Sequence, residues 1–264
     1  MKLKKTAMIK KLAFAICLIS IVSCDPSDDD GNNVTNNNFS YLPLNTNNSW
    51  DYDVKIGADS SVEGLTVSSV SGNEYTLTAN PNPPSGIMTG ILSSGTLRAT
   101  AGKLIGNGTV DFGIQGLDNL TLEITDGILY DQNANPDTEL YTTSGTSTQI
   151  IQAYDLDISY EITTVQLASV AQMNVNGTNY TDVIHSQLII NAAIGTVILV
   201  PIPLLSAQDV IVIDNYWAKD VGLIKSDTQL DYTLEDLSFL GAVLPVPQSA
   251  SILTEQDLTA YSIN

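Results

Sequence analysis

The sequence predicts an all-β domain made of one antiparallel sheet with about ten to twelve strands. Runs of residues alternate between apolar and polar, as half-buried strands require, and turn signals separate these runs. The composition is rich in Thr, Ser, Asn, Val and Ile, which favours strands and turns over helices. Hydrophobic residues make up 43% of the chain and charged residues 15%, so the chain is expected to fold around a core.

The folded part is expected to be a single β domain over residues 39–264. Trp50, Tyr52 and Val54 occupy alternate positions and predict its first strand. Two further strands are expected over residues 62–79, because a Ser-Gly pair interrupts that stretch.

Residues 87–105 are ambiguous between helix and strand. Ile87 and Ile91 have the spacing of one helical face, whereas Gly90 and Gly95 weaken a helix. We therefore predict a strand here.

Two dipeptides are typical of tight hairpin turns. Asp126-Gly127 lies between two apolar runs in residues 120–130, and Asn176-Gly177 precedes the run from Tyr180 to Ile190. Another turn is expected at Lys219-Asp220, between two late strands.

The most apolar stretch of the chain outside its amino-terminal leader runs from Ile189 to Leu205. A membrane helix is one interpretation, but Gly195, Pro201, Pro203 and the many β-branched residues argue against it. We predict a strand that is apolar on both faces, followed by a loop at Pro201–Ser206.

Residues 1–23 have the organisation of an export signal. A basic segment is followed by an apolar run from Leu12 to Val22, which is too short to span a bilayer stably. The run ends in Ile21-Val22-Ser23-Cys24, which resembles the bacterial lipobox. This resemblance implies that Cys24 receives a diacylglycerol on its sulfur, carries fatty acyl chains such as palmitate, and becomes the first mature residue. The alternative is an ordinary signal peptide followed by a chance cysteine.

Residues 24–38 form an acidic, Asn-rich tether with no apolar periodicity. Its motif Ser27-Asp28-Asp29-Asp30 resembles the surface-export signal of Bacteroidota lipoproteins. That resemblance implies an outer-membrane protein, anchored by lipid at the cell surface. The alternative is that these four residues are only part of a solvated linker.

The charge of the mature chain excludes one class of partner. Half of the ten basic residues lie in the leader, namely Lys2, Lys4, Lys5, Lys10 and Lys11. The mature chain therefore keeps five basic residues against 29 acidic ones and has a formal charge near −24. Such a surface repels nucleic acid and anionic lipid, so the expected membrane partner is outer-membrane lipid reached through acylated Cys24. Cys24 is also the only mature cysteine, so no disulfide can form within one chain.

Three segments resemble an uncharacterised family of Bacteroidota lipoproteins. They are Tyr41-Leu42-Pro43-Leu44 with Asn48-Ser49-Trp50-Asp51-Tyr52, the Val175–Val183 hairpin, and Tyr216–Lys225 with its Tyr-Trp-Ala and Val-Gly-Leu-Ile-Lys motifs. The resemblance implies a LolA/LolB-like half-barrel, in which a curved antiparallel sheet with few short helices surrounds an apolar hollow. It carries no known chemistry.

Catalytic signals are weak. His185 is the only histidine, no mature thiolate is free to join it in a metal site, and no nucleophile-elbow motif is present. We expect His185 to be structural, with no catalytic residue, no cofactor and no enzymatic activity. The 29 acidic residues leave a carboxylate glycosidase open as a less favoured alternative.

A calcium loop is a weak candidate at Asp131, Asn133 and Asn135, whose oxygens alternate as in calcium-binding loops. Pro136 stands where that loop needs glycine, and Thr142 stands where it needs glutamate. We therefore predict a plain turn and no metal.

Two proline-containing segments are the candidate ligand-binding region. Strand counting places both at the same end of the sheet, where they could frame the mouth of an apolar cavity; the candidates are Val200, Ile202, Leu244 and Val246. The alternative is that both segments simply cap the core.

Aromatic residues offer a second kind of site. Trp50, Tyr52, Tyr216 and Trp217 could form a platform for stacking sugars, although aromatic residues on strands more often belong to the core. The sequence thus predicts a non-catalytic surface lipoprotein that binds an apolar or amphipathic ligand, with a glycan-binding or adhesion module as the alternative.

Overall fold

Thirteen strands and one short helix make up the part of the chain that the computed structural model describes, which is residues 41–111, 120–151, 154–197, 201–236 and 247–264. The elements are β1 (Ser49–Ile56), β2 (Asp59–Ser71), β3 (Glu74–Asn80), α1 (Ile87–Ser93), β4 (Thr96–Thr100), β5 (Lys103–Asp111), β6 (Thr121–Asp131), β7 (Thr138–Ile151), β8 (Tyr154–Gln166), β9 (Val170–Val175), β10 (Thr178–Val197), β11 (Pro201–Ala218), β12 (Gly222–Thr233) and β13 (Ser249–Ser262). The predicted signal (1–23) and tether (24–38) lie outside the described residues.

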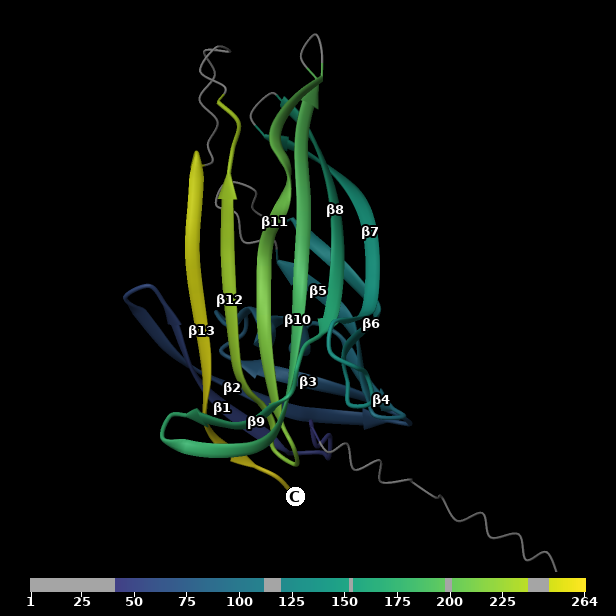
Figure 1. Ribbon diagram of the computed structural model, residues 1–264, viewed down its shortest axis with the longest axis vertical. Coiled ribbons are helices and arrows are strands. Elements are labelled where there is room, and N and C mark those ends of the chain that lie inside the picture. The colour runs from purple at the N-terminus through teal and green to yellow at the C-terminus, as the bar shows by residue number, and fades with distance from the viewer. Residues whose placement is uncertain (1–40, 112–119, 152–153, 198–200, 237–246) are drawn as a thin grey trace, which may run out of the picture. The chain divides into compact units, whose positions relative to one another are not determined.

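The strands form one antiparallel sheet in which the two halves of the chain meet. The order is β6-β5-β4-β3-β2-β1-β13-β12-β11-β10-β8-β7, and β9 pairs with β10 outside this path. The β1–β13 pair joins the first six strands to the last seven (Figure 1). The predicted all-β fold with a curved antiparallel sheet is therefore confirmed, whereas the specific LolA/LolB likeness stays a prediction.

The sheet curls until β6, one end of its order, reaches β8 near the other end. Thr164 of β8 donates a hydrogen bond from Oγ1 to the carbonyl of Ile128 in β6, at 2.7 Å. The Oε1 atom of Gln166 accepts one from the amide of Asp131 at 3.1 Å. Buried side chains of β8 thus satisfy the backbone of β6 in place of a strand ladder, and the sheet is nearly closed.

The first strand carries its aromatic residues inward, as the alternation predicts. Trp50 and Tyr52 are fully buried. The indole of Trp50 donates to the carbonyl of Val221 at 2.6 Å, and the Tyr52 hydroxyl donates to the carbonyl of Leu223 at 3.1 Å. These bonds tie β1 to the turn between β11 and β12 and to the start of β12, far away in the sequence.

A second aromatic group continues this layer. Trp217 is fully buried and donates from Nε1 to the Ser186 hydroxyl at 3.1 Å. Its ring centroid lies 5.2 Å from that of Tyr130, which in turn meets Tyr41 edge-on at 6.0 Å. Burial raises the pKa of the Tyr52 and Tyr130 phenols far above the ordinary value, so both stay neutral in the core. The inside of the sheet is therefore filled with side chains at this level.

Two of the predicted turns are confirmed and one is wrong. Asn176-Gly177 and Lys219-Asp220 connect paired strands, and the turn residues Asn176, Gly177 and Asp220 have positive φ. Asp126-Gly127 is instead a bulge within β6, where the pairing with β5 shifts its register and the Asp126 amide donates to the Asn107 side chain at 2.8 Å.

Residues 87–93 form helix α1, so the predicted strand at this place is wrong. Met88, Thr89, Ile91 and Leu92 are buried along one side of this short helix. The glycine-based argument failed because packing of this apolar face outweighs the modest helix cost of Gly90.

The apolar stretch from Ile189 to Leu205 enters two strands, and the predicted loop at Pro201–Ser206 is wrong. Burial in β10 alternates, so the stretch buries one face and only half-buries the other. Pro201 and Pro203 are tolerated in β11 because this part of the strand pairs with β10 alone; pairing with β12 begins at Ile211. No helix in the described ranges is long and apolar enough to cross a membrane.

Gly222 offers a test of the contact between β1 and the β11–β12 turn. Its φ is +126°, and a Cβ at this position would lie 2.6 Å from Nε1 of Trp50. We expect Gly222→Ala to lower the free energy of unfolding by about 2–3 kcal/mol, because backbone strain adds to steric overlap. Urea denaturation followed by tryptophan fluorescence would measure the change, since Trp50 and Trp217 are both buried.

Gly72→Ala is the matched control for this experiment. Gly72 also has a positive φ, +64°, but nothing lies within 4 Å of its added Cβ. We expect a loss of about 1 kcal/mol from strain alone. Equal losses at the two glycines would contradict a tight contact between Gly222 and Trp50.

Candidate functional site

The candidate site is an apolar hollow between α1 and the inward face of the sheet. Ile87 and Ile91 of α1 face Leu230 of β12, Ile252 of β13 and Ile56 of β1 across a volume of about 450 Å³. We call this space the α1 hollow. Its volume lies within the range of small-molecule sites, and its opposing apolar walls suit a hydrocarbon group.

The remaining wall of the α1 hollow is polar but holds little charge. Hydroxyl groups come from α1 and its carboxyl end, from β5, β6 and β13; they belong to Ser93, Ser94, Thr109, Thr121 and Thr254. Asp111 contributes one carboxylate, and among the described residues no Lys, Arg or His belongs to the wall. The described wall therefore offers no cation to an anionic head group.

A buried carboxylate holds the segment that leads into α1. Glu63 points inward from β2 and is fully buried. It accepts hydrogen bonds from the backbone amide of Ser85 and, at 3.1 Å to each oxygen, from that of Gly86. These amides offset the cost of burying the charge, and the carboxylate favours the start of a helix. Glu63 is thus committed to positioning α1, which argues against a role as a glycosidase acid.

The buried side chain of Gln256 lies beside Gly86, the last residue before α1. Its side chain is 1% exposed, and neither Nε2 nor Oε1 has a hydrogen-bond partner in the described part of the structure. A Cβ on Gly86 would come within 2.5 Å of Oε1 of Gln256 and 3.0 Å of Oε2 of Glu63. A side chain at position 86, which is itself part of the hollow wall, would therefore displace the end of Gln256.

The carboxyl end of α1 is fastened to β5. The Ser94 hydroxyl accepts from the Thr109 amide at 2.8 Å and lies 3.0 Å from the carbonyl of Ile91, to which it donates. Gly95 packs so closely against β5 that a Cβ would come within 2.0 Å of the Asn107 carbonyl oxygen. Both ends of α1 are thus fixed, so its side of the hollow is preformed.

Trp50, Tyr52 and Trp217, the candidates for an aromatic platform, are fully buried. They fill the core and cannot reach a glycan at the surface, which counts against the glycan-binding alternative. Ile202 is half-buried against the core in β11 and does not belong to the wall of the α1 hollow. The other candidates, Val200, Leu244 and Val246, lie outside the described residues.

The flanks of the two proline-containing segments do meet at one end of the sheet, as predicted. The amide of Glu235, after β12, donates to the carbonyl of Leu204 in β11 at 2.9 Å. The amide of Leu234 donates to the carbonyl of Gln248 at 2.8 Å. A cavity mouth framed by these segments stays a prediction.

Asp131, Asn133 and Asn135 belong to one turn, in which the polar groups of Asp131 and Asn133 are engaged locally. Oδ1 of Asp131 accepts from the Asn133 amide at 2.9 Å, while Oδ2 lies 3.5 Å from Nζ of Lys103. The Asn133 side chain donates to the carbonyl of Ala101 at 3.0 Å. These contacts are those of a plain turn.

His185 takes part in a small network on the outer face of β10 and β11. Its Nε2 lies 2.7 Å from Oδ1 of Asp214, and its ring stacks on Tyr216 with centroids 4.3 Å apart. Gln187 also donates to Asp214, at 3.1 Å. Ring stacking and a shared carboxylate give His185 a structural place between the two strands.

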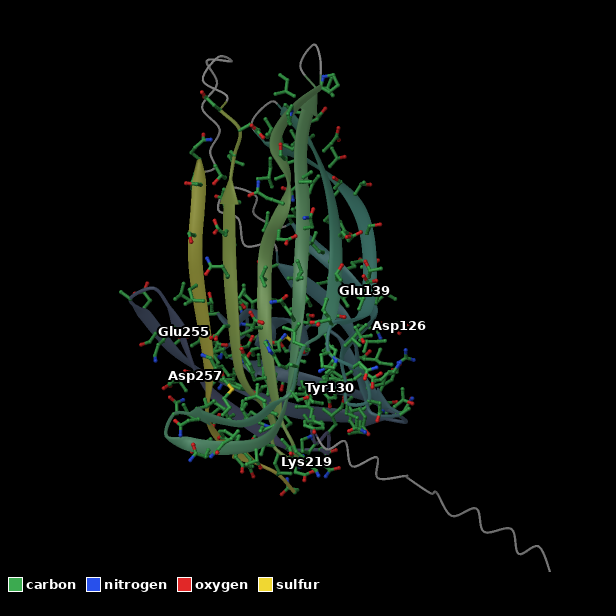
Figure 2. The ribbon with its side chains drawn as sticks, viewed as in Figure 1. Asp126, Tyr130, Glu139, Lys219, Glu255 and Asp257 are labelled. Atoms are coloured by element: carbon green, nitrogen blue, oxygen red, sulfur yellow. The ribbon has the colours of Figure 1, made fainter. Side chains whose placement is uncertain are left out.

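Acidic residues gather on the outer face of β12 and β13 around one lysine. Nζ of Lys225 lies 2.7 Å from Asp227 and 3.1 Å from Asp257, and Figure 2 shows Asp257 and Glu255 along β13. Burial alone would lower the pKa of Lys225, but hydrogen bonds and charge from both aspartates raise it. Burial raises the pKa of Asp227 despite its lysine partner. No group of three or more metal-ligating side chains is found in the described ranges.

Comparisons with known proteins add little. No family model and no curated protein matches the sequence. Among solved structures, the chain is similar to a crystal structure described as a "putative lipoprotein from Parabacteroides distasonis ATCC 8503", at 9% identity over 84% of this chain and 99% of that chain, with a TM-score of 0.35. That description names the class of protein that the leader of this chain predicts, and at this score the likeness carries no further argument.

The residues of the α1 hollow were not predicted from the sequence, although the position of Glu63 gave one signal. Glu63 stands in phase with Leu65 and Val67, two inward positions of β2, so a carboxylate is placed on the buried face. An ionised side chain in such a position requires dedicated hydrogen-bond donors. The hollow itself is assembled from five separate strands and a helix, and no local pattern could have predicted it.

We expect Glu63→Gln to loosen the segment before α1. The amide retains one acceptor oxygen but loses the charge and the second acceptor, so the free energy of unfolding should fall by about 1–3 kcal/mol. Chemical denaturation would measure this, and hydrogen exchange should show faster exchange at the amides of Ser85 and Gly86. Glu74→Gln, at an exposed glutamate on β3, is the control and should change neither quantity. An unaffected Glu63→Gln variant would contradict the proposed role of the carboxylate.

Proposed function

We propose that this chain is a lipid-anchored envelope lipoprotein whose β domain binds a neutral amphiphilic ligand in the α1 hollow, without catalysis. The observation that carries the binding role is the α1 hollow itself, with its opposing walls of Ile87, Ile91, Leu230 and Ile252. Such a site differs from the aromatic platform that a glycan-binding module would need.

The anchor is supported by the sequence of the amino-terminal segment. Residues 1–23 supply an export signal, the lipobox places the acylated cysteine at position 24, and Ser27-Asp28-Asp29-Asp30 favours the outer face of the outer membrane. Several acyl chains hold a protein at a bilayer far more firmly than one chain. The tether over residues 24–38 would give the β domain reach above that surface.

The chemistry of the wall favours a neutral ligand over an anionic one. Branched aliphatic side chains on both sides would contact a hydrocarbon chain or ring, and the hydroxyl groups of Ser93, Thr109 and Thr254 could bind a hydroxyl or amide head. Asp111 and the acidic surface as a whole repel a carboxylate or phosphate head. A curved sheet around an apolar hollow also agrees with the LolA/LolB resemblance.

A fluorescent fatty alcohol is the direct probe of this proposal. We expect it to bind the protein with higher affinity than the fatty acid of equal chain length at neutral pH. Ile252→Asp should weaken binding of the alcohol roughly tenfold or more, because it removes apolar contact worth about 1.5 kcal/mol and brings a charge into the wall. Fluorescence titration would measure the dissociation constants.

Leu253→Asp is the matched control. Leu253 is 46% exposed and Ile252 42%, but the two are consecutive in β13 and point to opposite faces of the sheet. Leu253→Asp should bind the probe as the unsubstituted protein does. Equal weakening in both variants, or no binding by the unsubstituted protein, would sink the proposal.

The anchor is tested separately. We expect Cys24→Ser to move the protein from the membrane fraction to the soluble fraction and to abolish incorporation of labelled palmitate, because the acylated sulfur is lost. Cys17→Ser, within the leader, should change neither result. Persistent membrane association of Cys24→Ser without label would overturn the anchor but not the binding site.

A further inference from the structure

A row of buried polar residues crosses the inner face of the sheet. The register places each member directly opposite the next one on the neighbouring strand, and each is between 1% and 3% exposed; the members are Gln166 of β8, Ser186 of β10, Asn215 of β11, Ser226 of β12 and Gln256 of β13. Polar groups removed from water are costly unless they are hydrogen-bonded, so each member of this row needs a partner.

Gln256 is the member of this row that lacks a partner. The amide of Gln166 bonds to the backbone of β6 and of β10, and the Ser186 hydroxyl accepts from a buried indole. The Ser226 hydroxyl donates to Asn215 at 2.9 Å. At Gln256, by contrast, both Nε2 and Oε1 are unpaired within the described residues. The row therefore ends on β13 with an unused donor and an unused acceptor.

The unpaired amide lies directly behind the wall of the α1 hollow. Thr254, which precedes Gln256 on the same face of β13, belongs to that wall, and so does Gly86. A Cβ on Gly86 would come within 2.5 Å of Oε1 of Gln256. No hydrogen bond holds the amide in place, and the side chain can rotate about several bonds. A group bound beside Thr254 is therefore within reach of Gln256.

Polarity and burial increase together along the inner face of β13. The exposed fraction falls from 42% at Ile252 to 6% at Thr254 and 1% at Gln256. The residues opposite them on β12 change in the same direction, from leucine through threonine to serine. The α1 hollow thus has an exposed apolar end and a buried polar end. An amphiphile fits this arrangement with its hydrocarbon chain at Ile252 and its head group toward Gln256.

Building on the binding role proposed above, we infer that Gln256 selects the head group of the ligand and that this head group is an uncharged carboxamide. An amide carries a donor and an acceptor on neighbouring atoms, so it can pair with both ends of the Gln256 amide through two hydrogen bonds. An ester has acceptors alone and leaves Oε1 of Gln256 unpaired. A carboxylate head would approach the buried Glu63, whose Oε2 lies 3.0 Å from the same Cβ position on Gly86.

Displacement of the fluorescent fatty alcohol tests this inference. The competitors are decanamide and methyl decanoate, which carry the same acyl chain. We expect decanamide to displace the probe at about tenfold lower concentration, because the ester leaves a buried acceptor unpaired. In Gln256→Met, which keeps the length of the side chain but removes both polar groups, the two compounds should displace the probe equally. Apolar contacts with the wall still hold the probe in this variant.

The stability of Gln256→Met without ligand is a second measurement. Removing a buried amide that has no partner should leave the urea midpoint unchanged or raise it, whereas removing a hydrogen-bonded amide would lower it. Gln229→Met is the matched control for binding. Gln229 lies half-buried on the outer face of β12, where its amide donates to the Ser251 hydroxyl at 3.1 Å. This variant should keep the tenfold preference for decanamide.

Equal displacement by both compounds from the unsubstituted protein would overturn the inference and leave binding in the hollow intact. A preference for decanamide that survives in Gln256→Met would overturn it as well, as would a lower urea midpoint of that variant. Failure of the unsubstituted protein to bind the fluorescent probe or either competitor would overturn the proposed function and this inference together.

Discussion

The pairing of β1 with β13 is the constraint on which the rest of the structure depends. It joins strands from opposite ends of the chain, with Ser49 opposite Ser262 and Ile56 opposite Thr254. Without it, the strands β1 to β6 and β7 to β13 would be two open sheets, each with an additional unpaired edge. Because so long a loop must close before this contact forms, the pair needs strong support from packing.

Buried aromatic residues give that support, which explains why the most recognisable motifs carry no chemistry. Trp50 and Tyr52 of β1 both donate to backbone carbonyls at or just after the β11–β12 turn, and Gly222 leaves the room that the indole needs. The early and late segments on which the resemblance to Bacteroidota lipoproteins rests are thus one contact in space. Their residues specify how the sheet closes.

The same closure separates a filled end of the sheet from a hollow one. The aromatic layer of Trp50, Trp217 and Tyr130 leaves no space for a ligand at its level. Further along β12 and β13, the inward residues Leu230 and Ile252 face α1 across a gap instead. Glu63 and Ser94 fix the two ends of α1, so polar contacts at the ends of the helix hold the gap open.

Patterns of neighbouring residues correctly predicted the buried face of a strand and the position of a tight turn. Alternation placed Trp50 and Tyr52 on a buried face, and Asn176-Gly177 forms a turn because both residues accept a positive φ. The failures have tertiary causes. Asp126-Gly127 has the composition of a turn, but β5 continues beside it and makes it a bulge. Pro201 stands in a strand because one of its sides has no partner there, and α1 forms because its apolar face is buried.

The candidate site could not be predicted for the same reason. Ile56, Ile87 and Ile252 are far apart in the sequence and meet only when the sheet curls. The aromatic candidates Trp50 and Trp217 were chosen by residue type, which is the same for a core and for a binding platform. Burial, which decides between the two, is a property of the closed sheet.

Isoleucine methyl NMR during titration with a neutral amphiphile tests the central claim most directly. The account predicts that the methyl signals of Ile56, Ile87, Ile91 and Ile252 shift together and saturate, since these side chains line the α1 hollow. The signals of Ile158, Ile190 and Ile213, which are buried elsewhere in the core, should stay in place. Unchanged signals from the hollow, or shifts confined to the second group, would contradict it.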